Sequence, residues 1–340
     1  MPTPSVSVLM PVYNAAQTLD ETLASLQAQT LDDFEIVAVD DGSQDDSLDL
    51  LRAWARRDHR LQAIDGGRKG LIGALNYGLK NCRAPLVARM DADDRVHPQR
   101  LAQQRALLDG DASLSVVGSL VELFPRDSLS PGMAQYENWL NGLVDHPSIS
   151  REIFIESPIV HPSAMVRRRE LLELGAYQDR GWPEDYDLWL RYFTAGRRFA
   201  KVPQTLVYWR EHPNRLTRTD RRYSVENFLR AKAHYLLKGP LQNCDGLVVW
   251  GAGKTGRRLS KHLIRGGCPP AVFIDIVAAK IGTTLRQIPI VSTDDLPAWW
   301  NRFRRPFLLA AVASHQARGL IRAHLRQMEL SEGTHFLCVA

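Results

Sequence analysis

The stretch SVSVLMPVYNAAQTLDETLASLQAQ, residues 5–29, decides the fold class of this chain. It begins with a nearly continuous apolar run, which is typical of a strand that is buried on both faces. The run is followed by Leu19, Leu23 and Leu26, whose spacing places them on one face of a helix. We therefore expect a buried strand followed by an amphipathic helix.

The same alternation continues through the first ninety residues. Strand patterns occupy residues 33–43, 61–66 and 85–94, and helical patterns occupy residues 47–58 and 70–82. Strands that are joined by helices pair in parallel, and the helices cover the faces of the sheet. The sequence therefore predicts an α/β fold with a mostly parallel sheet. Its ligand site should lie beyond the carboxyl ends of the strands.

The rest of the chain predicts a second, smaller domain. Residues 97–210 mix helices with further strands, and residues 126–150 show no clear pattern, so we expect an irregular lid or acceptor-side loop there. A helix over residues 224–239 leads to PLQNCDG, whose Pro and Gly suit a linker. Strand and helix patterns then start again. We expect domains over residues 1–240 and 245–340.

Composition excludes several classes of protein. Apolar residues make up 44% and charged residues 24%, the balance of a globular protein. No apolar run reaches the roughly 18 residues that a membrane span needs, and the N-terminal run is broken by Pro11, so we expect no signal peptide. The four scattered cysteines indicate reduced thiols and a cytoplasmic location.

The net charge of +5 includes arginine clusters at residues 167–169 and 215–223. A solvated surface explains such clusters, and so does attraction to a nucleotide, a lipid diphosphate or an anionic membrane face. We expect no nucleic acid as a partner, because no recognisable binding module surrounds the clusters.

The first acidic motif, VDDGS, ends the second expected strand. The carboxylates of Asp40 and Asp41 can accept hydrogen bonds from a ribose or a base, and Gly42 permits a tight turn beneath a ligand. Helix capping by Ser43 or Asp45 is the alternative, and for this motif alone it is the better explanation.

The second motif, MDADD, ends the fourth expected strand. In an extended segment Asp91 and Asp93 point the same way, so their oxygens can hold Mg²⁺ or Mn²⁺ together with a diphosphate. Capping of the following helix is an equally good explanation for this motif alone. We expect Asp94 to have that capping role.

The third motif lies in WPEDYDLWLRYF, residues 182–193, which predicts a helix with a buried face. Glu184 and Asp185 lie at its N-terminus, where acids complement the helix dipole. This explanation is favoured for the motif alone. The functional alternative is a general base, because a helix N-terminus keeps a carboxylate ionised and able to accept a proton.

Together, the ordered motifs resemble a known family. PVYNAAQTLDETLASLQAQT, VAVDDGS, GLIGALNYGL, ARMDADD, HPQRLAQQ, HPSAMVRR and PEDYDLWLR follow one another between residues 5 and 212. This set resembles the family 2 glycosyltransferases, inverting enzymes of the GT-A fold. The resemblance implies a metal-dependent hexosyltransferase with Mn²⁺ or Mg²⁺ as cofactor. It implies transfer from a nucleotide sugar, with UDP as the expected nucleotide, to a glycan or lipid-linked acceptor.

The resemblance also implies a biological setting, the synthesis of surface polysaccharide or lipopolysaccharide. Such an enzyme is expected in the cytoplasm, with a peripheral contact to the inner face of the membrane. The sequence does not identify the donor sugar or the acceptor.

The resemblance assigns roles to individual residues. Asp185 is the expected catalytic base, and Glu184 is the second choice. The nucleotide is expected to contact Pro11, Tyr13, Asn14, Asp40, Asp41, Lys69, Arg89 and Asp91. The metal is expected at Asp91, Asp93 and His212, and the acceptor side at His161 and Trp182. A structural role is the alternative for each of the two histidines.

The second domain carries a glycine motif of its own. GAGKTG, residues 251–256, fits the pattern G-x-G-x-x-G between a strand and a helix, and Asp275 ends the next strand. The region resembles small Rossmann-like domains of bacterial sugar-modifying enzymes. We expect Gly251, Gly253, Gly256 and Asp275 to form a nucleotide-binding or regulatory module. A glycine turn that serves only packing is the alternative.

Other functions are less consistent with the sequence. A nucleotidyltransferase would need a glycine-rich, basic loop after the first strand, where this chain has PVYNAAQT. An oxidoreductase would rest on GAGKTG alone. A regulatory protein that binds a nucleotide sugar, with the C-terminal domain as its sensor, is the main alternative to an enzyme.

Overall fold

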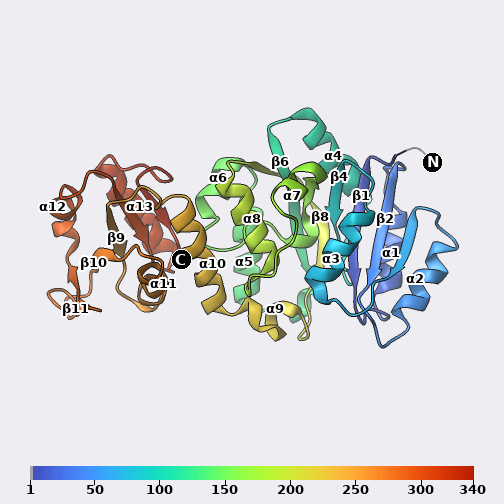
Figure 1. Ribbon diagram of the computed structural model, residues 1–340, viewed down its shortest axis with the longest axis horizontal. Coiled ribbons are helices and arrows are strands. Elements are labelled where there is room, and N and C mark those ends of the chain that lie inside the picture. The colour runs from blue at the N-terminus through green and yellow to red at the C-terminus, as the bar shows by residue number, and fades with distance from the viewer. Residues whose placement is uncertain (1–2) are drawn as a thin grey trace. The chain divides into compact units, whose positions relative to one another are not determined.

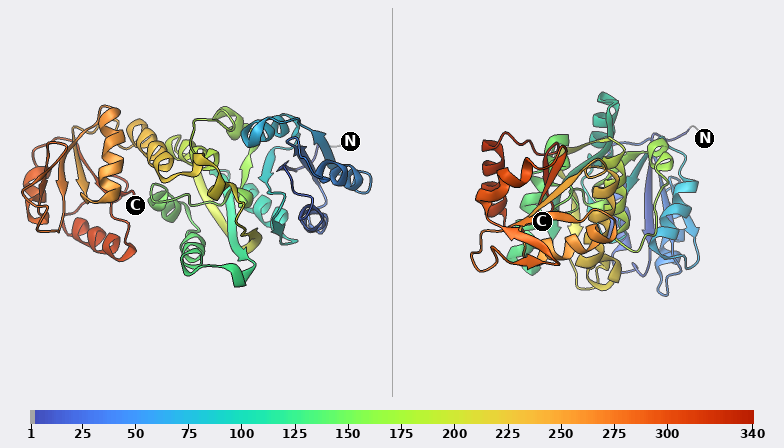
Figure 2. Two further views of the ribbon diagram at one scale, coloured as in Figure 1. Left: turned by 90° about the horizontal axis from the view of Figure 1, so that it is seen from below. Right: turned by 60° about the vertical axis from the view of Figure 1, so that its left-hand side comes forward.

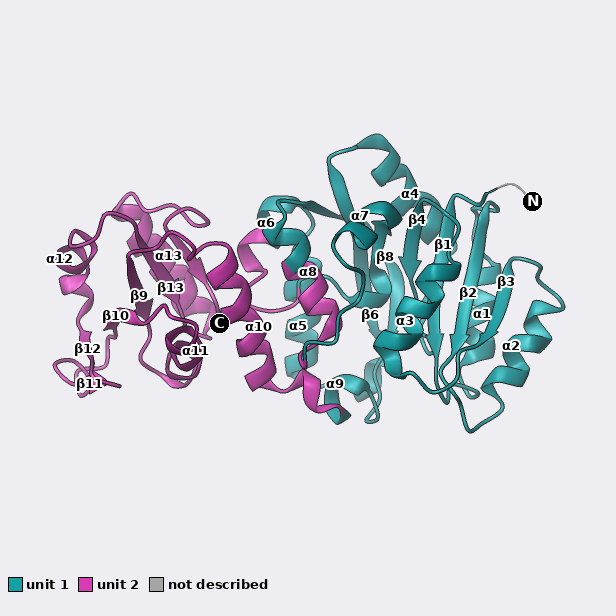
Figure 3. Cartoon of the chain, viewed as in Figure 1, with its two compact units in different colours: residues 1–149, 158–180, 191–219 teal, residues 150–157, 181–190, 220–340 magenta. Residues whose placement is uncertain are grey.

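The computed structural model describes residues 3–340, which form two compact units (Figure 3). Unit 1 consists of residues 1–149, 158–180 and 191–219, and unit 2 consists of residues 150–157, 181–190 and 220–340. Unit 2 therefore includes two short segments that precede the expected linker. The division into domains over residues 1–240 and 245–340 stays a prediction.

Unit 1 is built on an eight-stranded sheet (Figure 1). Its strands are β1 (Val6–Val12), β2 (Phe34–Asp40), β3 (Leu61–Asp65), β4 (Leu86–Arg89), β5 (Arg95–Val96), β6 (Leu114–Phe124), β7 (Met165–Arg167) and β8 (Arg198–Arg210). Their order in the sheet is β3-β2-β1-β4-β7-β6-β8-β5. The first four strands pair in parallel, as do β6 and β8, whereas β7 and β5 are antiparallel to their neighbours. The predicted α/β class with a mostly parallel sheet is confirmed.

Helices connect these strands. They are α1 (Leu19–Gln27), α2 (Ser47–Ala55), α3 (Gly70–Asn81), α4 (Arg100–Gly110), α5 (Pro131–Asn141), α6 (His146–Glu152), α7 (Arg168–Glu173), α8 (Glu184–Thr194) and α9 (Leu216–Thr219). Two 3-10 turns, η1 (Arg126–Ser128) and η2 (His161–Ser163), complete this part of the chain. The boundary between the units falls within α6 and α8.

The opening stretch folds as its pattern predicts. All seven residues of β1 are buried, and Leu19, Leu23 and Leu26 of α1 belong to the same apolar cluster. Burial of apolar side chains of this size stabilises a fold by about 1.5–3 kcal/mol each. The strand β1 and the helix α1 can therefore both be predicted from the pattern of apolar residues in the sequence.

The expectation of an irregular loop over residues 126–150 is wrong. The segment contains η1, α5 and most of α6, and Leu140 of α5 is buried in the core of unit 1. The start of α5 has ordinary helix signals, because the Ser130 side chain accepts a hydrogen bond from the Met133 amide and Pro131 follows the cap. Its apolar residues are too few to give a clear period.

Lys201 of β8 is buried in unit 1, and its Nζ donates to the backbone oxygen of Leu140 at 2.6 Å. Burial lowers the pKa of Lys201 to about 7. The unfolded chain keeps the ordinary pKa of 10.5, so it binds the proton more tightly than the folded chain does. The free energy of unfolding should therefore rise as the pH increases from about 7 towards 10.

We expect Lys201→Met to abolish this pH-dependent contribution and to stabilise the protein by roughly 1–3 kcal/mol at pH 7, because a buried charge is replaced by an apolar chain. Urea unfolding at several pH values between neutral and alkaline measures both effects. Lys80→Met, on the exposed side of α3, is the matched control. An unchanged pH dependence in Lys201→Met would contradict the assignment.

Unit 2 contains a separate six-stranded sheet (Figure 2). Its strands are β9 (Gly246–Trp250), β10 (Pro270–Ile274), β11 (Thr284–Leu285), β12 (Ile288–Val291), β13 (Pro306–Ala310) and β14 (Phe336–Cys338). Their order is β11-β12-β10-β9-β13-β14, and only the β11–β12 pair is antiparallel. The five parallel strands thus follow the 3-2-1-4-5 order of a doubly wound sheet.

The helices of unit 2 are α10 (Val225–Lys238), α11 (Lys254–Arg265), α12 (Leu296–Trp300) and α13 (His315–Gln327), with 3-10 turns η3 (Arg221–Tyr223) and η4 (Thr293–Asp295). Ile321 and Leu325 of α13 pack with Trp250 and Leu308 in one apolar core. Across residues 3–340, no helix has both the length and the apolar character that crossing a bilayer requires.

Candidate active site

The loop after β2 is tied to the loop after β1. The Asn14 amide donates to Ser43 Oγ at 3.0 Å, and the Gln44 amide donates to Asn14 Oδ1 at 2.8 Å. Asn14 has a φ of 49°, and Gly42 has a φ of 74°. The carboxyl ends of these two strands are therefore joined into one edge, as the parallel order predicts.

Asp40 lies at that edge, and only one of its two carboxylate oxygens accepts hydrogen bonds from the described residues. Its Oδ2 accepts hydrogen bonds from the amides of Gly42 and Ser43, at 3.1 and 3.0 Å. Its Oδ1 is buried, and within the described part of the chain it has no hydrogen-bond partner. A buried acceptor of this kind carries a desolvation cost that a donor on a ligand would remove.

Asp41 holds the loop that precedes α3. Its Oδ1 accepts a hydrogen bond from the Lys69 amide at 2.6 Å, while the Asp41 amide donates to the Val12 oxygen of β1. The Arg68 guanidinium lies 6.0 Å from the centre of the Tyr13 ring, and that ring is 45% exposed. Three predicted nucleotide residues, Tyr13, Asp41 and Lys69, therefore share this edge. Pro11 is instead buried within β1.

The MDADD acids form a cluster after β4. Asp91, Asp93 and Asp94 each offer an oxygen, and these oxygens all lie within 4.8 Å of one another. The His212 Nε2 lies 3.0 Å from Asp93 Oδ2, so the structure brings this predicted metal residue to the cluster. Asp91 makes an ion pair with Arg89.

Electrostatics favours a cation at this cluster. Burial, and then the repulsion from Asp91, raises the pKa of Asp93, while burial and repulsion from both neighbours raise the pKa of Asp94 well above its usual value. Asp94 Oδ2 is also buried without a hydrogen-bond partner among the described residues. Oxygen donors in this arrangement fit Mg²⁺ or Mn²⁺, whose charge would offset the repulsion.

The expectation that Asp94 starts the next helix is wrong. Helix α4 begins only at Arg100, with Gln99 in the cap position. Asp94 is buried instead, and its Oδ1 accepts a hydrogen bond from the Arg210 amide of β8 at 2.7 Å. The short strand β5 between Asp94 and α4 separates the cluster from the helix.

Two arginines that the sequence did not single out support the cluster. Arg100 is fully buried, and it donates to the Arg89 oxygen at 2.7 Å and to Gln104 Oε1 at 3.1 Å. Arg210 donates from Nε to the Asp93 oxygen at 2.6 Å. Burial lowers the pKa of Arg100 to about 9, and Asp94 acts in the opposite direction. The positively charged side chains of Arg100 and Arg210 therefore lie next to the acidic cluster.

His161 is buried in unit 1, and its Nε2 lies 3.3 Å from the Tyr177 hydroxyl. Burial and the Arg89 charge hold the pKa of His161 well below its usual value, so the ring stays neutral at pH 7. This environment agrees with a core histidine, the alternative that the sequence left open. Its role on the acceptor side stays a prediction.

The acids of α8 differ from one another in burial. Glu184 and Asp187 are 1% and 0% exposed, whereas Asp185 is only partly buried. Asp185 Oδ1 accepts a hydrogen bond from the Tyr186 amide at 2.7 Å, within the first turn of the helix. Trp182 is buried, and its Nε1 donates to Asp187 Oδ1 at 2.8 Å. Among these acids, Asp185 is therefore the most exposed.

The glycine turn of unit 2 is tightly packed. A side chain at Gly256 would lie 1.9 Å from the Gly251 oxygen, and Gly251 itself has a φ of 110°. Asp275 accepts hydrogen bonds from the Ala252 and Val277 amides and from Lys280 Nζ. Burial raises the pKa of Asp275, but these bonds outweigh it and the pKa lies below its usual value. Nucleotide binding by this turn, including Gly253, stays a prediction.

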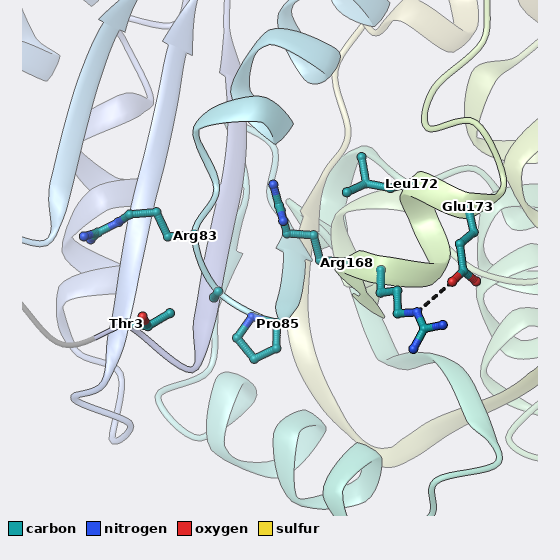
Figure 4. A pocket seen from close by; sticks show the side chains of 8 residues that line it. Thr3, Arg83, Pro85, Arg168, Leu172 and Glu173 are labelled. Atoms are coloured by element: carbon teal, nitrogen blue, oxygen red, sulfur yellow. Dashed lines mark hydrogen bonds and ion pairs between the residues drawn. The ribbon is translucent and has the colours of Figure 1, made fainter.

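Figure 4 shows a surface hollow in unit 1, lined by Thr3, Arg83, Ala84, Pro85, Arg168, Arg169, Leu172 and Glu173. It lies where β4 begins, so it is at the opposite edge of the sheet from Asp40 and Asp91. Arg83 is paired with Glu35 and Arg169 with Glu173, both at 2.7 Å. These ion pairs neutralise two of the arginines that line the hollow. We therefore do not assign the hollow to the candidate active site.

Unit 1 has the sheet of the GT-A fold, with acidic clusters after β2 and β4. The family model described as Glycosyl transferase family 2 matches residues 7–175. The putative glycosyltransferase EpsE of Bacillus subtilis (strain 168) is 30% identical over 279 residues, which cover 79% of this chain and 92% of EpsE. The amylovoran biosynthesis glycosyltransferase AmsE of Erwinia amylovora is 30% identical over 204 residues, 59% of this chain and 74% of AmsE.

Solved structures share the fold at low sequence identity. TarS 1-349 of S. aureus in complex with UDP gives a TM-score of 0.54 at 19% identity, over 87% of this chain and 78% of that chain. This likeness concerns the fold alone. The match to the family model and to EpsE shows that the chain belongs to the family 2 glycosyltransferases.

Proposed function

We propose that this glycosyltransferase moves a hexose from a nucleoside-diphosphate donor to a hydroxyl group of a glycan or lipid-linked acceptor, with inversion at the anomeric carbon. The observation that carries the proposal is the pair of acidic clusters at one edge of the sheet. In one cluster the buried Asp40 Oδ1 accepts no hydrogen bond from residues 3–340, and the other cluster has three crowded carboxylates. The unsatisfied Asp40 oxygen could accept a hydrogen bond from the base or the ribose of a nucleotide. The three carboxylates could hold a cation together with a diphosphate.

Residues of unit 1 would bind the donor. Asp40, Asp41 and Tyr13 would contact the nucleoside, and Lys69 and Arg89 would lie near its phosphates. Asp91 and Asp93, with His212 beside them, would hold Mn²⁺ or Mg²⁺. When bound, such a cation neutralises the charge of the departing diphosphate.

Asp185 would act as the general base. Its carboxylate takes the proton of the acceptor hydroxyl as that oxygen forms a bond to the anomeric carbon. The bond between the anomeric carbon and the diphosphate oxygen breaks in the same step, and the electron pair leaves with the diphosphate. One displacement inverts the configuration, and no covalent intermediate with the protein is needed. A helix N-terminus keeps such a carboxylate ionised at neutral pH.

The donor and the setting are inferred from one structural neighbour and one relative. The complex of TarS contains UDP, and AmsE is named for amylovoran biosynthesis. We infer UDP as the nucleotide and the synthesis of a surface polysaccharide or lipopolysaccharide as the process. The enzyme would work in the cytoplasm, in peripheral contact with the inner face of the membrane through its arginine-rich surface.

A donor screen tests the proposed function. We expect the purified protein, with Mn²⁺ and glycan or lipid-linked acceptors, to release nucleoside diphosphate from one class of nucleotide sugar, most readily a UDP-sugar. Asp91→Ala should lower the rate by about a hundredfold or more, because the charge that holds the cation is lost. Chelation with EDTA should have a similar effect.

Asp127→Ala is the control for the screen, since this exposed acid belongs to η1 and lies outside both acidic clusters. It should retain the wild-type rate. The proposal fails if no donor is turned over, or if Asp91→Ala releases nucleotide as fast as the wild type does.

A further inference from the structure

The first turn of α8 is held by side chains that come later in the chain, all within unit 2. The Tyr223 hydroxyl of η3 donates to both carboxylate oxygens of Glu184, at 2.8 and 3.0 Å. The Tyr235 hydroxyl of α10 donates to Asp187 Oδ1 at 2.7 Å. Two tyrosines therefore bind the acids on either side of Asp185.

Apolar packing reinforces these hydrogen bonds. The rings of Tyr186 and Phe228 lie 5.3 Å apart, and those of Trp182 and His234 lie 5.5 Å apart. The Tyr186 hydroxyl also donates to the Ile153 oxygen at 2.8 Å, so the segment over residues 150–157 takes part. Ring pairs of this kind add about 0.5–1.5 kcal/mol each beyond burial. The turn is therefore fixed from several directions.

The tyrosine hydroxyls are among the donors to these buried acids, and Asp187 Oδ1 also accepts from Trp182 Nε1. Glu184 and Asp187 are almost fully buried, and a buried carboxylate without a donor is costly. Burial, and then Glu184 and Asp185, raises the pKa of Tyr223 well above its usual value, so the hydroxyl keeps the proton that it donates. Asp185 lies between the two fixed acids, and its own Oδ1 accepts from the Tyr186 amide. The Asp185 carboxylate therefore belongs to the same helical turn as these two acids.

We propose that Tyr223 and Tyr235 are positioning residues, which set the direction of the Asp185 carboxylate through Glu184 and Asp187. Residues 220–235 therefore contribute to catalysis and do not serve only to connect the C-terminal sheet. The inference rests on the proposed function, because it needs Asp185 to be the base. A base that is misplaced by about 1 Å loses rate without losing donor affinity, since positioning acts on the transition state.

Tyr223→Phe and Tyr235→Phe test the inference, because each removes one hydroxyl and keeps the ring. We expect kcat to fall about tenfold in each variant while KM for the donor changes less than about twofold. Titration with UDP and Mn²⁺ should give wild-type affinity. Amide exchange in residues 184–190 should become about tenfold faster, with exchange in β1 unchanged.

Tyr208→Phe on β8 is the matched control, because the Tyr208 ring lies against the Arg95 guanidinium, 5.5 Å from it, and Arg95 is not an acid of α8. It should leave kcat and the exchange of residues 184–190 unchanged. Unchanged kcat in both test variants would overturn the inference. So would a fall in kcat that is matched by weaker UDP binding and faster exchange throughout unit 1, since that pattern indicates general destabilisation.

The two proposals can fail separately. If the wild type turns over no donor, the proposed function fails. Faster amide exchange confined to residues 184–190 in the two variants would then still support the claim that Tyr223 and Tyr235 fix the first turn of α8. Unchanged amide exchange in residues 184–190 would show that the two tyrosines do not fix this turn, whatever the activity of the wild type.

Discussion

Replacing Asp185 with Asn should lower kcat by roughly 10²- to 10⁴-fold, which is the usual contribution of a general base. The asparagine keeps the size of the side chain and can accept the hydrogen bond from the Tyr186 amide, but it cannot take a proton. The donor KM and the affinity for UDP should stay close to the wild-type values, since the predicted nucleotide residues lie in unit 1. Steady-state kinetics with a saturating acceptor measures the effect.

Glu184→Gln is the comparison that separates the two acids. Glu184 is 1% exposed and bound by Tyr223, so we assign it a supporting role and expect a smaller loss, on the order of tenfold. A larger loss in Glu184→Gln than in Asp185→Asn would exchange the two roles.

The sequence predicted the sheet of unit 1 because its strands and helices have distinct periods. β1 is buried throughout and apolar except for Ser7, and α1 repeats its leucines at helical spacing. In a parallel sheet the residues after each strand meet at one edge, so the sequence alone assigns Asp40 and Asp91 to that edge. Local pattern and topology were sufficient here.

The supporting residues could not be predicted in this way. Arg100 begins a polar helix, and nothing near it in the sequence indicates that it is fully buried against the Arg89 oxygen. Tyr223 and Tyr235 act on acids that lie far from them along the chain. Long-range contacts of this kind depend on packing, and a single sequence has no signal for them. Arg210 had a weak signal, because it lies close to His212.

Asp94 shows where the prediction from the MDADD motif was wrong in detail. The sequence placed it at a helix start because acids are frequent there. The strand β5 intervenes, so the side chain turns inward and joins Asp91 and Asp93. A third carboxylate at the cluster changes what each acid should contribute, and substitutions at Asp93 and Asp94 should therefore differ.

Asp93→Asn should abolish stabilisation by the metal and lower kcat/KM by about a thousandfold, because a charged ligand beside His212 is lost. Mn²⁺ with UDP at about 100 times the dissociation constant should raise the free energy of unfolding of the wild type by about 2.7 kcal/mol. Asp93→Asn should gain none of this. Urea unfolding with and without Mn²⁺ and UDP provides the measurement.

Asp94→Asn should behave differently when no metal is present. It removes one of three crowded charges, and the amide oxygen can still accept the hydrogen bond from Arg210. We expect this variant to be more stable than the wild type without metal, by about 1 kcal/mol, and to bind Mn²⁺ more weakly. If Asp94→Asn were less stable than the wild type in EDTA, or if Asp93→Asn gained the full stabilisation from Mn²⁺, the cluster would not be a cation site. A bound cation would offset the repulsion among the three carboxylates, so removing one of them should help the metal-free protein and harm metal binding.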